Sequence, residues 1–200
     1  GLPHGPTDVP GWVRRSSQAV KVAVTPRGTH FSKALNTSHC YRVTMKALGL
    51  LGGTFDRFHK GHRKLLEIGL SECQNLEIWM TSDNLAKGKD PRIESWSDRK
   101  ELIINTLEGD VLERISFHVL EDLYGPATNR EDVQAIVCTP ETVENCKKIN
   151  SLRLENSLAP LHIIIAEHEL DWKGRPISST NIRRGIMYRE GYPWLHEEIG

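Results

Sequence analysis

Residues 48–62 have the sequence LGLLGGTFDRFHKGH, and this stretch decides the fold. It begins with a short apolar run, continues through Gly52 and Gly53, and ends in two histidines that flank Gly61. A helical pattern follows directly. A strand that passes through a glycine-rich loop into a helix is the unit from which parallel sheets are built. The stretch therefore predicts an α/β fold in which a strand delivers a loop to a helix N-terminus.

Short apolar runs and helical patterns alternate along the rest of the chain. We expect brief strands at residues 48–51, 76–80, 115–120, 133–138 and 161–166. Nearly continuous apolar content is typical of strands that helices cover on both faces. The alternation favours one doubly wound parallel sheet with right-handed crossovers. Such sheets bind ligands beyond the carboxyl ends of their strands, so we expect chemistry in the loops that follow them.

Apolar side chains and capping residues predict where the helices lie. Leu66, Leu70 and Cys73 mark one helix face at steps of four and three. Leu102, Ile103 and Leu107 mark another. Ser95 and Asp98 have the spacing of a capping box ahead of the second face. Thr139 followed by Pro140 predicts an N-cap with proline at the first helical position of another helix.

The composition is that of an ordinary globular domain. The chain has 200 residues, of which 38% are hydrophobic and 26% are charged. Lys+Arg and Asp+Glu both number 26, so no global basic field indicates a nucleic-acid partner. We find no run of 18 apolar residues and no C-x-x-C pair, and we expect a soluble cytoplasmic protein with no membrane partner and no disulfide framework.

The first 44 residues differ from the rest in charge. They hold six basic side chains and one acidic side chain, and they contain scattered prolines. We expect a poorly ordered basic extension at 1–44, a folded domain at 45–188 and a tail at 189–200. The extension has the composition of an organellar transit segment, but it also fits a dispensable leader, and Met45 fits a native start.

The loop after the first strand has the chemistry of a phosphate site. Gly52 and Gly53 allow a tight turn and let a phosphate reach main-chain N–H groups. His59 and His62 are expected to face the same space, where imidazoles donate to phosphate oxygens and, if protonated, offset charge on phosphorus. Histidines three apart also suit zinc, but no further Cys/His cluster with ligand spacing accompanies them.

Two other segments carry polar groups at strand or helix ends. Residues 176–185, PISSTNIRRG, place three hydroxyls at a helix N-terminus, where they suit phosphate, followed by an arginine suited to a bidentate grip. Without a partner motif, the same segment is an ordinary N-cap with solvated arginines. Residues 81–89, TSDNLAKGK, add lysines directly after the second strand.

Together, these segments resemble the signatures of one nucleotidyltransferase superfamily, which includes cytidylyltransferases, FAD synthetases and pantetheine-phosphate adenylyltransferases. The loop after the first strand resembles GTFD…HxGH, residues 176–185 resemble ISSTxIR, and residues 81–89 resemble TSDxLAxxK. The resemblance implies a Rossmann-like nucleotidyltransferase fold. Its implied nucleotide and substrate residues are Gly52, Gly53, Thr54, Phe55, Asp56, Gly61, Lys89, Ser178, Ser179, Thr180 and Arg183, and its implied catalytic residues are His59, His62 and Lys87.

The resemblance also implies roles within that site. His62 with a lysine would stabilise the α-phosphate, and His59 would hold the triphosphate. Alignment does not separate Lys87, our first candidate for this lysine, from Lys89, the second. Thr54 would sit between the two substrates.

Two later stretches narrow the choice of acceptor substrate. Residues 122–127, DLYGPA, and residues 138–142, CTPET, resemble the archaeal and eukaryotic type of pantetheine-phosphate adenylyltransferase. Residues 171–176, DWKGRP, stand where cytidylyltransferases have an RTxG-like segment before their serine/threonine motif. This difference counts against CTP as the nucleotide donor. The implied reaction moves AMP from ATP, with Mg²⁺, to 4′-phosphopantetheine. The alternatives are adenylyl transfer to FMN, cytidylyl transfer to a polyol phosphate, and a catalytically silent nucleotide-binding module.

Overall fold

The structure, a computed structural model, describes residues 45–107 and 109–194, so the predicted extension at 1–44 and residues 195–200 of the predicted tail lie outside the described residues. The strands form one parallel sheet in the order β3-β2-β1-β4-β5. Their bounds are β1 Lys46–Gly53, β2 Cys73–Thr81, β3 Ile115–Leu120, β4 Ala135–Cys138 and β5 His162–Ile165. The predicted doubly wound α/β fold is confirmed, and each strand overlaps the run that predicted it.

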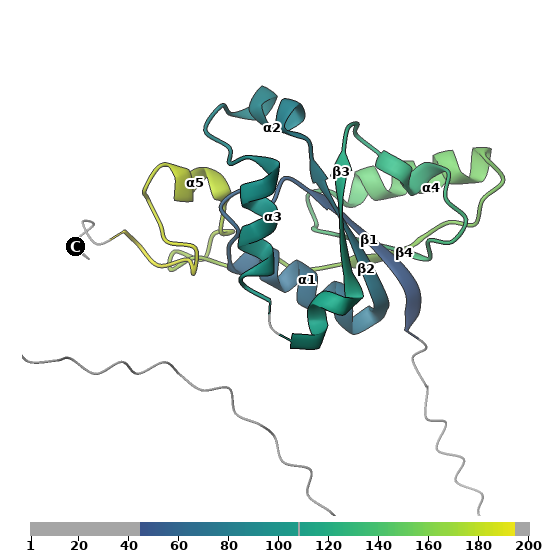
Figure 1. Ribbon diagram of the computed structural model, residues 1–200, viewed down its shortest axis with the longest axis horizontal. Helices are drawn as coiled ribbons and strands as arrows, with labels where there is room; N and C mark the ends of the chain where they lie inside the picture. Colours follow the sequence, from purple (N-terminus) through teal and green to yellow (C-terminus); the bar gives the residue numbers. More distant parts are fainter. Residues whose placement is uncertain (1–44, 108, 195–200) are drawn as a thin grey trace, which may run out of the picture. The chain divides into compact units, whose positions relative to one another are not determined.

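Helices cover both faces of this sheet (Figure 1). They are α1 Lys60–Glu72, α2 Asp83–Lys89, α3 Trp96–Ile104, α4 Val143–Glu155 and α5 Ser179–Arg183, with 3₁₀ turns η1 Gly109–Arg114 and η2 Gly125–Thr128. Helices α1 and α3 lie on one face, and α4 lies on the other. Within the described ranges, no helix is long and apolar enough to cross a bilayer.

Two apolar clusters hold the layers together, and β1 contributes to both. Successive strand residues point to opposite faces, so Leu51 packs in the cluster under α1 while Leu50 packs in the cluster under α4. Both side chains are buried. Burying one leucine stabilises a fold by about 1.5–3 kcal/mol, which explains why β1 is apolar on both faces.

Three predicted helix boundaries were wrong. Helix α1 ends at Glu72, and Cys73 begins β2, although it still packs in the cluster under α1. Leu107 packs in the same cluster from beyond the end of α3. Helix α4 begins at Val143 with Thr142 as N-cap, because Pro140 lies in a turn that closes from the Thr142 N–H to the Thr139 carbonyl at 3.0 Å. Proline suits the second position of a turn as well as the first of a helix.

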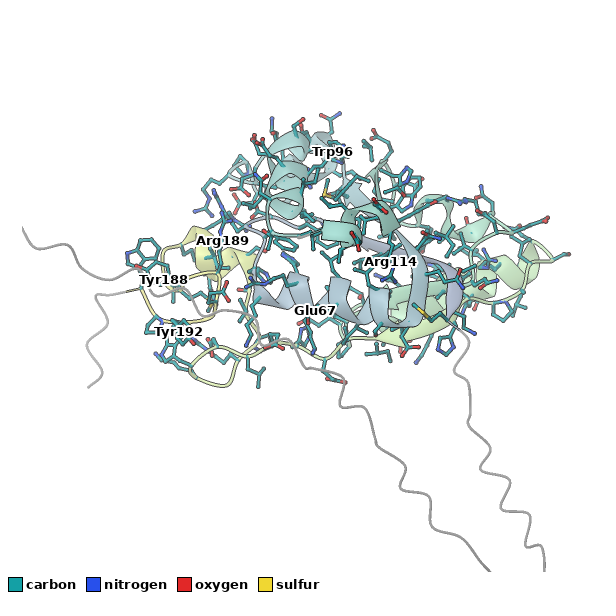
Figure 2. All side chains as sticks on the ribbon, turned by 60° about the horizontal axis from the view of Figure 1, so that its bottom comes forward. Glu67, Trp96, Arg114, Tyr188, Arg189 and Tyr192 are labelled. Carbon is teal, nitrogen blue, oxygen red and sulfur yellow. The ribbon has the colours of Figure 1, made fainter. Side chains whose placement is uncertain are left out.

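The segment after α5 folds back to the N-terminal end of α1, where Figure 2 shows Tyr188, Arg189 and Tyr192. The Lys60 N–H donates to the Arg189 carbonyl at 3.0 Å, and Arg63 pairs with Glu190 at 2.5 Å. Arg189 and Glu190, which fall in the tail that we expected at 189–200, therefore contact the helix that follows the glycine-rich loop.

Candidate active site

The loop between β1 and α1 lies at the switch point of the sheet, where β1 has β2 on one side and β4 on the other. Its backbone is held in an uncommon shape, because Phe55 and Arg57 both have positive φ, at 54° and 50°. A Cβ on Gly53 would lie 3.0 Å from the Phe55 ring, which explains the glycine there. The buried Phe55 ring anchors the loop.

The two histidines stand at the first turn of α1. His59 is the buried N-cap, and the imidazole of His62 stacks on it with ring centroids 3.8 Å apart. The His59 N–H donates to His62 Nδ1 at 3.4 Å, so the proton of a neutral His62 resides on Nε2. Burial lowers the pKa of His59 to about 4 and lowers the pKa of His62 well below its usual value. Both imidazoles are therefore neutral at pH 7, and each can donate through only one ring nitrogen.

A polar cavity of about 470 Å³ opens beside this loop. Its lining gathers four cationic and two anionic side chains, which leaves it net positive. The lining residues are Thr54, Asp56, Lys89, Asp90, Arg92, Ile93, Ser179, Thr180, Arg183 and Arg184. Neither histidine lines this cavity.

Helix α5 is docked onto the same loop through Asp56. Arg183 forms an ion pair with the buried Asp56 carboxylate, and the Ser179 hydroxyl donates to the Asp56 carbonyl at 2.8 Å. Arg183 also lies 3.2 Å from Asp90. Ser178 caps α5 by accepting from a main-chain N–H, so the N-cap interpretation of this serine holds as well. The predicted hydroxyl and arginine segment thus meets the GTFD loop, with Arg183 engaged by carboxylates.

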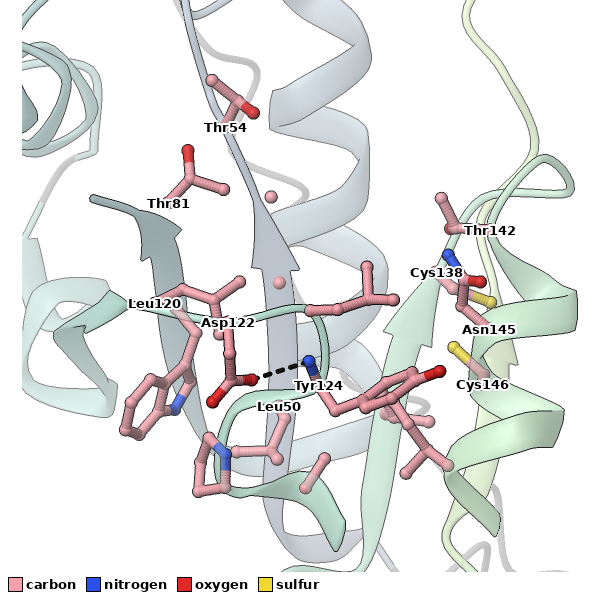
Figure 3. Close-up of a pocket in the computed structure, with 18 of the residues that line it drawn as sticks. Leu50, Thr54, Thr81, Leu120, Asp122, Tyr124, Cys138, Thr142, Asn145 and Cys146 are labelled. Carbon is pink, nitrogen blue, oxygen red and sulfur yellow. Dashed lines mark hydrogen bonds between the residues drawn. The ribbon is translucent and has the colours of Figure 1, made fainter. Parts of the chain in front are cut away.

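The second, apolar cavity lies between the sheet and α4 and has a volume of about 350 Å³ (Figure 3). Side chains from β1, β2, β3, β4, α2 and α4, and from the connection between β3 and β4, line it. They include Leu50, Trp79, Leu120, Asp122, Tyr124, Ile136, Cys138, Thr142, Asn145, Cys146 and Ile149. The DLYGPA and CTPET stretches thus both contribute to its wall.

The two cavities meet at Thr54 and Lys89, which line both of them. Lys89 Nζ lies 3.4 Å from Thr54 Oγ1. Lys87, our first candidate for the phosphate-binding lysine, is exposed on the same helix and lines neither cavity. The structure thus brings the second candidate to the junction.

Sequence reasoning missed Arg99, which joins the elements around this junction. Its fully buried guanidinium donates to the Thr54 carbonyl at 2.7 Å and to the Thr81 carbonyl at 2.8 Å. The same side chain lies 3.2 Å from Asp83, at the start of α2. A cation four residues before Ile103, on the apolar face of α3, was the signal that could have identified it.

Among the described residues, no group of three or more His, Cys, Asp or Glu side chains could hold a metal ion. The two carboxylates of the polar cavity, Asp56 and Asp90, both pair with Arg183. The hydrogen bond from Arg92 is the main cause that holds the pKa of Asp90 below its usual value. The described residues therefore offer no carboxylate cage at this site.

Comparison with known families decides the class of the protein. The profile of the family described as "Cytidylyltransferase-like" matches residues 50–185, which contain the loop, both cavities and α5. The chain belongs to this family. Its membership agrees with the resemblance of the GTFD and ISST segments.

Relatives of this cytidylyltransferase-like protein narrow its place in the family. The phosphopantetheine adenylyltransferase of Methanopyrus kandleri is 33% identical over 136 residues, which cover 67% of this chain and 87% of the relative. That of Methanothermobacter thermautotrophicus is 38% identical over 148 residues, which cover 73% and 88%. The chain therefore groups with the phosphopantetheine adenylyltransferases.

A solved structure has the same fold. The crystal structure of a protein of unknown function from Archaeoglobus fulgidus is 26% identical to this chain, with a TM-score of 0.52. The match covers 59% of this chain and 87% of that chain.

Proposed function

We propose that this protein transfers AMP from ATP to 4′-phosphopantetheine and releases dephospho-coenzyme A and pyrophosphate. The observation that carries the proposal is the junction of a cationic cavity with an apolar cavity at Thr54 and Lys89. A nucleotidyl transfer needs a site for a triphosphate and a site for an acceptor that touch at one point. The names of the archaeal relatives support this choice of donor and acceptor.

The polar cavity suits the triphosphate of ATP. Its net positive lining offsets phosphate charge, and Arg92 and Arg184 add guanidinium groups near Arg183. One buried nitrogen atom of the cavity lining, Arg183 Nε, has no hydrogen-bond partner among the described residues. A buried polar atom without a partner costs about 1–3 kcal/mol, so a ligand that supplied acceptors would relieve that cost.

The apolar cavity suits the pantetheine arm of the acceptor. Its volume lies in the usual range for small-molecule sites, and its walls are mostly aliphatic and aromatic with a few polar groups. Thr142, Asn145 and Asp122 offer hydrogen-bonding groups to the amides of such an arm. An arm seated here would place its phosphate end at Thr54 and Lys89.

The proposed chemistry is an in-line displacement. A phosphate oxygen of the acceptor attacks the α-phosphorus of ATP, and the bond between the α-phosphorus and the bridging oxygen breaks to release pyrophosphate. The attacking phosphate is already ionised, so positioning and charge stabilisation carry the rate. Lys89 would offset phosphate charge at the junction of the two cavities. The Nε2–H of His62 would donate to a phosphate oxygen after a side-chain movement that brings the imidazole to the junction.

Magnesium enters this proposal as part of the nucleotide. Mg²⁺ commonly binds substrate phosphates and keeps several water molecules. Because Asp56 and Asp90 are paired with Arg183, the described residues do not form a Mg²⁺ site, and no step in the proposed reaction depends on one.

Pyrophosphate release with a matrix of donors and acceptors tests the proposal. ATP and CTP would each be combined with 4′-phosphopantetheine, FMN and a polyol phosphate. We expect turnover with ATP and 4′-phosphopantetheine, with equal amounts of pyrophosphate and dephospho-coenzyme A. Turnover with another pair alone would assign a different transferase, and ATP binding without any turnover would indicate a silent module.

A further inference from the structure

The apolar cavity contains two thiols that the proposed transfer does not use. Cys138 is the last residue of β4, and Cys146 lies one turn into α4. Both line the cavity, and each is only 4% exposed. In Figure 3, their sulfur atoms lie next to one another.

The packing of β4 and α4 brings the two cysteines into one cluster. Strand β4 is held between β1 and β5, and α4 packs on it through the apolar cluster that contains both cysteines. A hydrogen bond between the thiols lowers the pKa of Cys138 and raises that of Cys146. Cys138 is therefore the thiol that ionises first, and the thiolate is the reactive form.

We propose that Cys138 and Cys146 form an oxidisable dithiol that reacts with a small aliphatic disulfide entering the apolar cavity. The Cys138 thiolate attacks one sulfur atom of the disulfide, and one small thiolate leaves. The Cys146 sulfur then attacks Cys138, closes an intramolecular disulfide and expels the second small thiolate. Two electrons pass from the protein to the small disulfide, and the two protons of the protein thiols leave with its two halves.

The third cysteine of the described ranges provides an internal reference. Cys73 is fully buried in the cluster under α1, on the opposite face of the sheet, and it does not line the cavity. It should stay a free thiol under conditions that oxidise the pair, and it should be alkylated after denaturation.

Closing the disulfide would join β4 to α4 within the wall of the apolar cavity. The consequence for catalysis rests on the proposed function, because it assumes that the acceptor occupies this cavity. We expect the KM for 4′-phosphopantetheine to rise by about tenfold, since small displacements of a binding wall are costly. The KM for ATP should change less than about twofold, because neither cysteine lines the polar cavity.

Mass spectrometry of the full chain tests the dithiol directly. Reduced protein is incubated with hydroxyethyl disulfide, denatured and treated with N-ethylmaleimide. We expect a loss of two hydrogens in the peptides that carry Cys138 and Cys146, no alkylation of either cysteine, and reversal by dithiothreitol. Cleavage after Glu141 or Glu144, between the two cysteines, should leave fragments that stay joined until reduction. Alkylation of both cysteines, or a separate adduct on each, would overturn the proposal.

Single variants test the order of attack. Cys146→Ser should trap one small thiol on Cys138, whereas Cys138→Ser should leave Cys146 unmodified in the same time. Equal labelling of both variants would contradict the assignment of Cys138 as the attacking thiol. These readouts do not depend on turnover, so an inactive reduced protein would refute the proposed function without affecting the dithiol. A disulfide that forms without raising the acceptor KM would contradict the proposed effect on the cavity.

Discussion

At the scale of single residues, the proposed chemistry depends most on which ring nitrogen of each histidine carries a proton. His62 Nδ1 accepts from the His59 N–H, which leaves Nε2–H as the donor. The proposed reaction needs a side-chain movement that brings this donor to a phosphate oxygen, and removing one donor to a developing charge typically lowers a rate by roughly 10²- to 10³-fold. We therefore expect His62→Ala to lower kcat by that order while circular dichroism still reports a folded chain. Near-normal turnover in this variant would exclude His62 from the mechanism.

His59 also sets a pH dependence of stability. Burial lowers its pKa to about 4, whereas an unfolded histidine titrates near 6.5. Between those values the unfolded chain binds a proton that the folded chain does not, so stability falls as pH falls. From pH 7 to pH 5, this difference lowers the free energy of unfolding by about 2 kcal/mol.

Urea unfolding at both pH values measures this loss. The variant His59→Gln lacks the titrating group, so its free energy of unfolding should fall less over the same interval. An equal fall in the variant and the parent protein would assign the acid sensitivity to other groups.

At the scale of elements, two buried arginines tie different parts of the site together. Arg99 holds carbonyls at the ends of β1 and β2, next to the junction. Arg153 donates to the Ala127 carbonyl in η2 at 2.7 Å and to the Arg130 carbonyl at 2.8 Å, beside the apolar cavity. Replacing either with Met leaves buried carbonyls without donors, which should cost roughly 2–4 kcal/mol.

The two variants should nevertheless differ in kinetics. We expect Arg99→Met mainly to lower kcat, because Thr54 and the start of α2 lose a shared anchor. Arg153→Met should mainly raise the KM for the acceptor, because η2 carries part of the apolar cavity. Steady-state kinetics below the melting temperature of both variants measures the difference, and identical kinetic changes would reduce both arginines to structural roles.

The elements also show what a sequence can and cannot predict here. The strands were predictable because short, nearly continuous apolar runs are typical of buried strands. Ser95 caps α3, as its spacing from Asp98 indicated. The start of α4 was not, because proline suits both a turn and a first helical turn. Only coordinates show which of Lys87 and Lys89 lines the cavities, because two helical residues that are two positions apart are rotated by about 200° around the helix axis.

At the scale of the whole molecule, the sheet, both apolar clusters and both cavities are formed by residues after position 44. We expect a chain that begins at Met45 to keep the melting temperature and kcat of the full chain. Thermal unfolding and pyrophosphate release on the two proteins check this. A shortened chain that fails to fold or loses its activity would show that residues 1–44 contribute to the domain.

The central claim is that transfer occurs where the two cavities meet. Lys87 and Lys89 provide a matched pair for testing it, because both lie on α2 and their replacement by Met changes net charge equally. We predict that Lys89→Met lowers kcat for dephospho-coenzyme A formation by roughly 10²-fold or more, whereas Lys87→Met stays within about threefold of the parent protein. A large loss in Lys87→Met together with normal turnover in Lys89→Met would contradict the account.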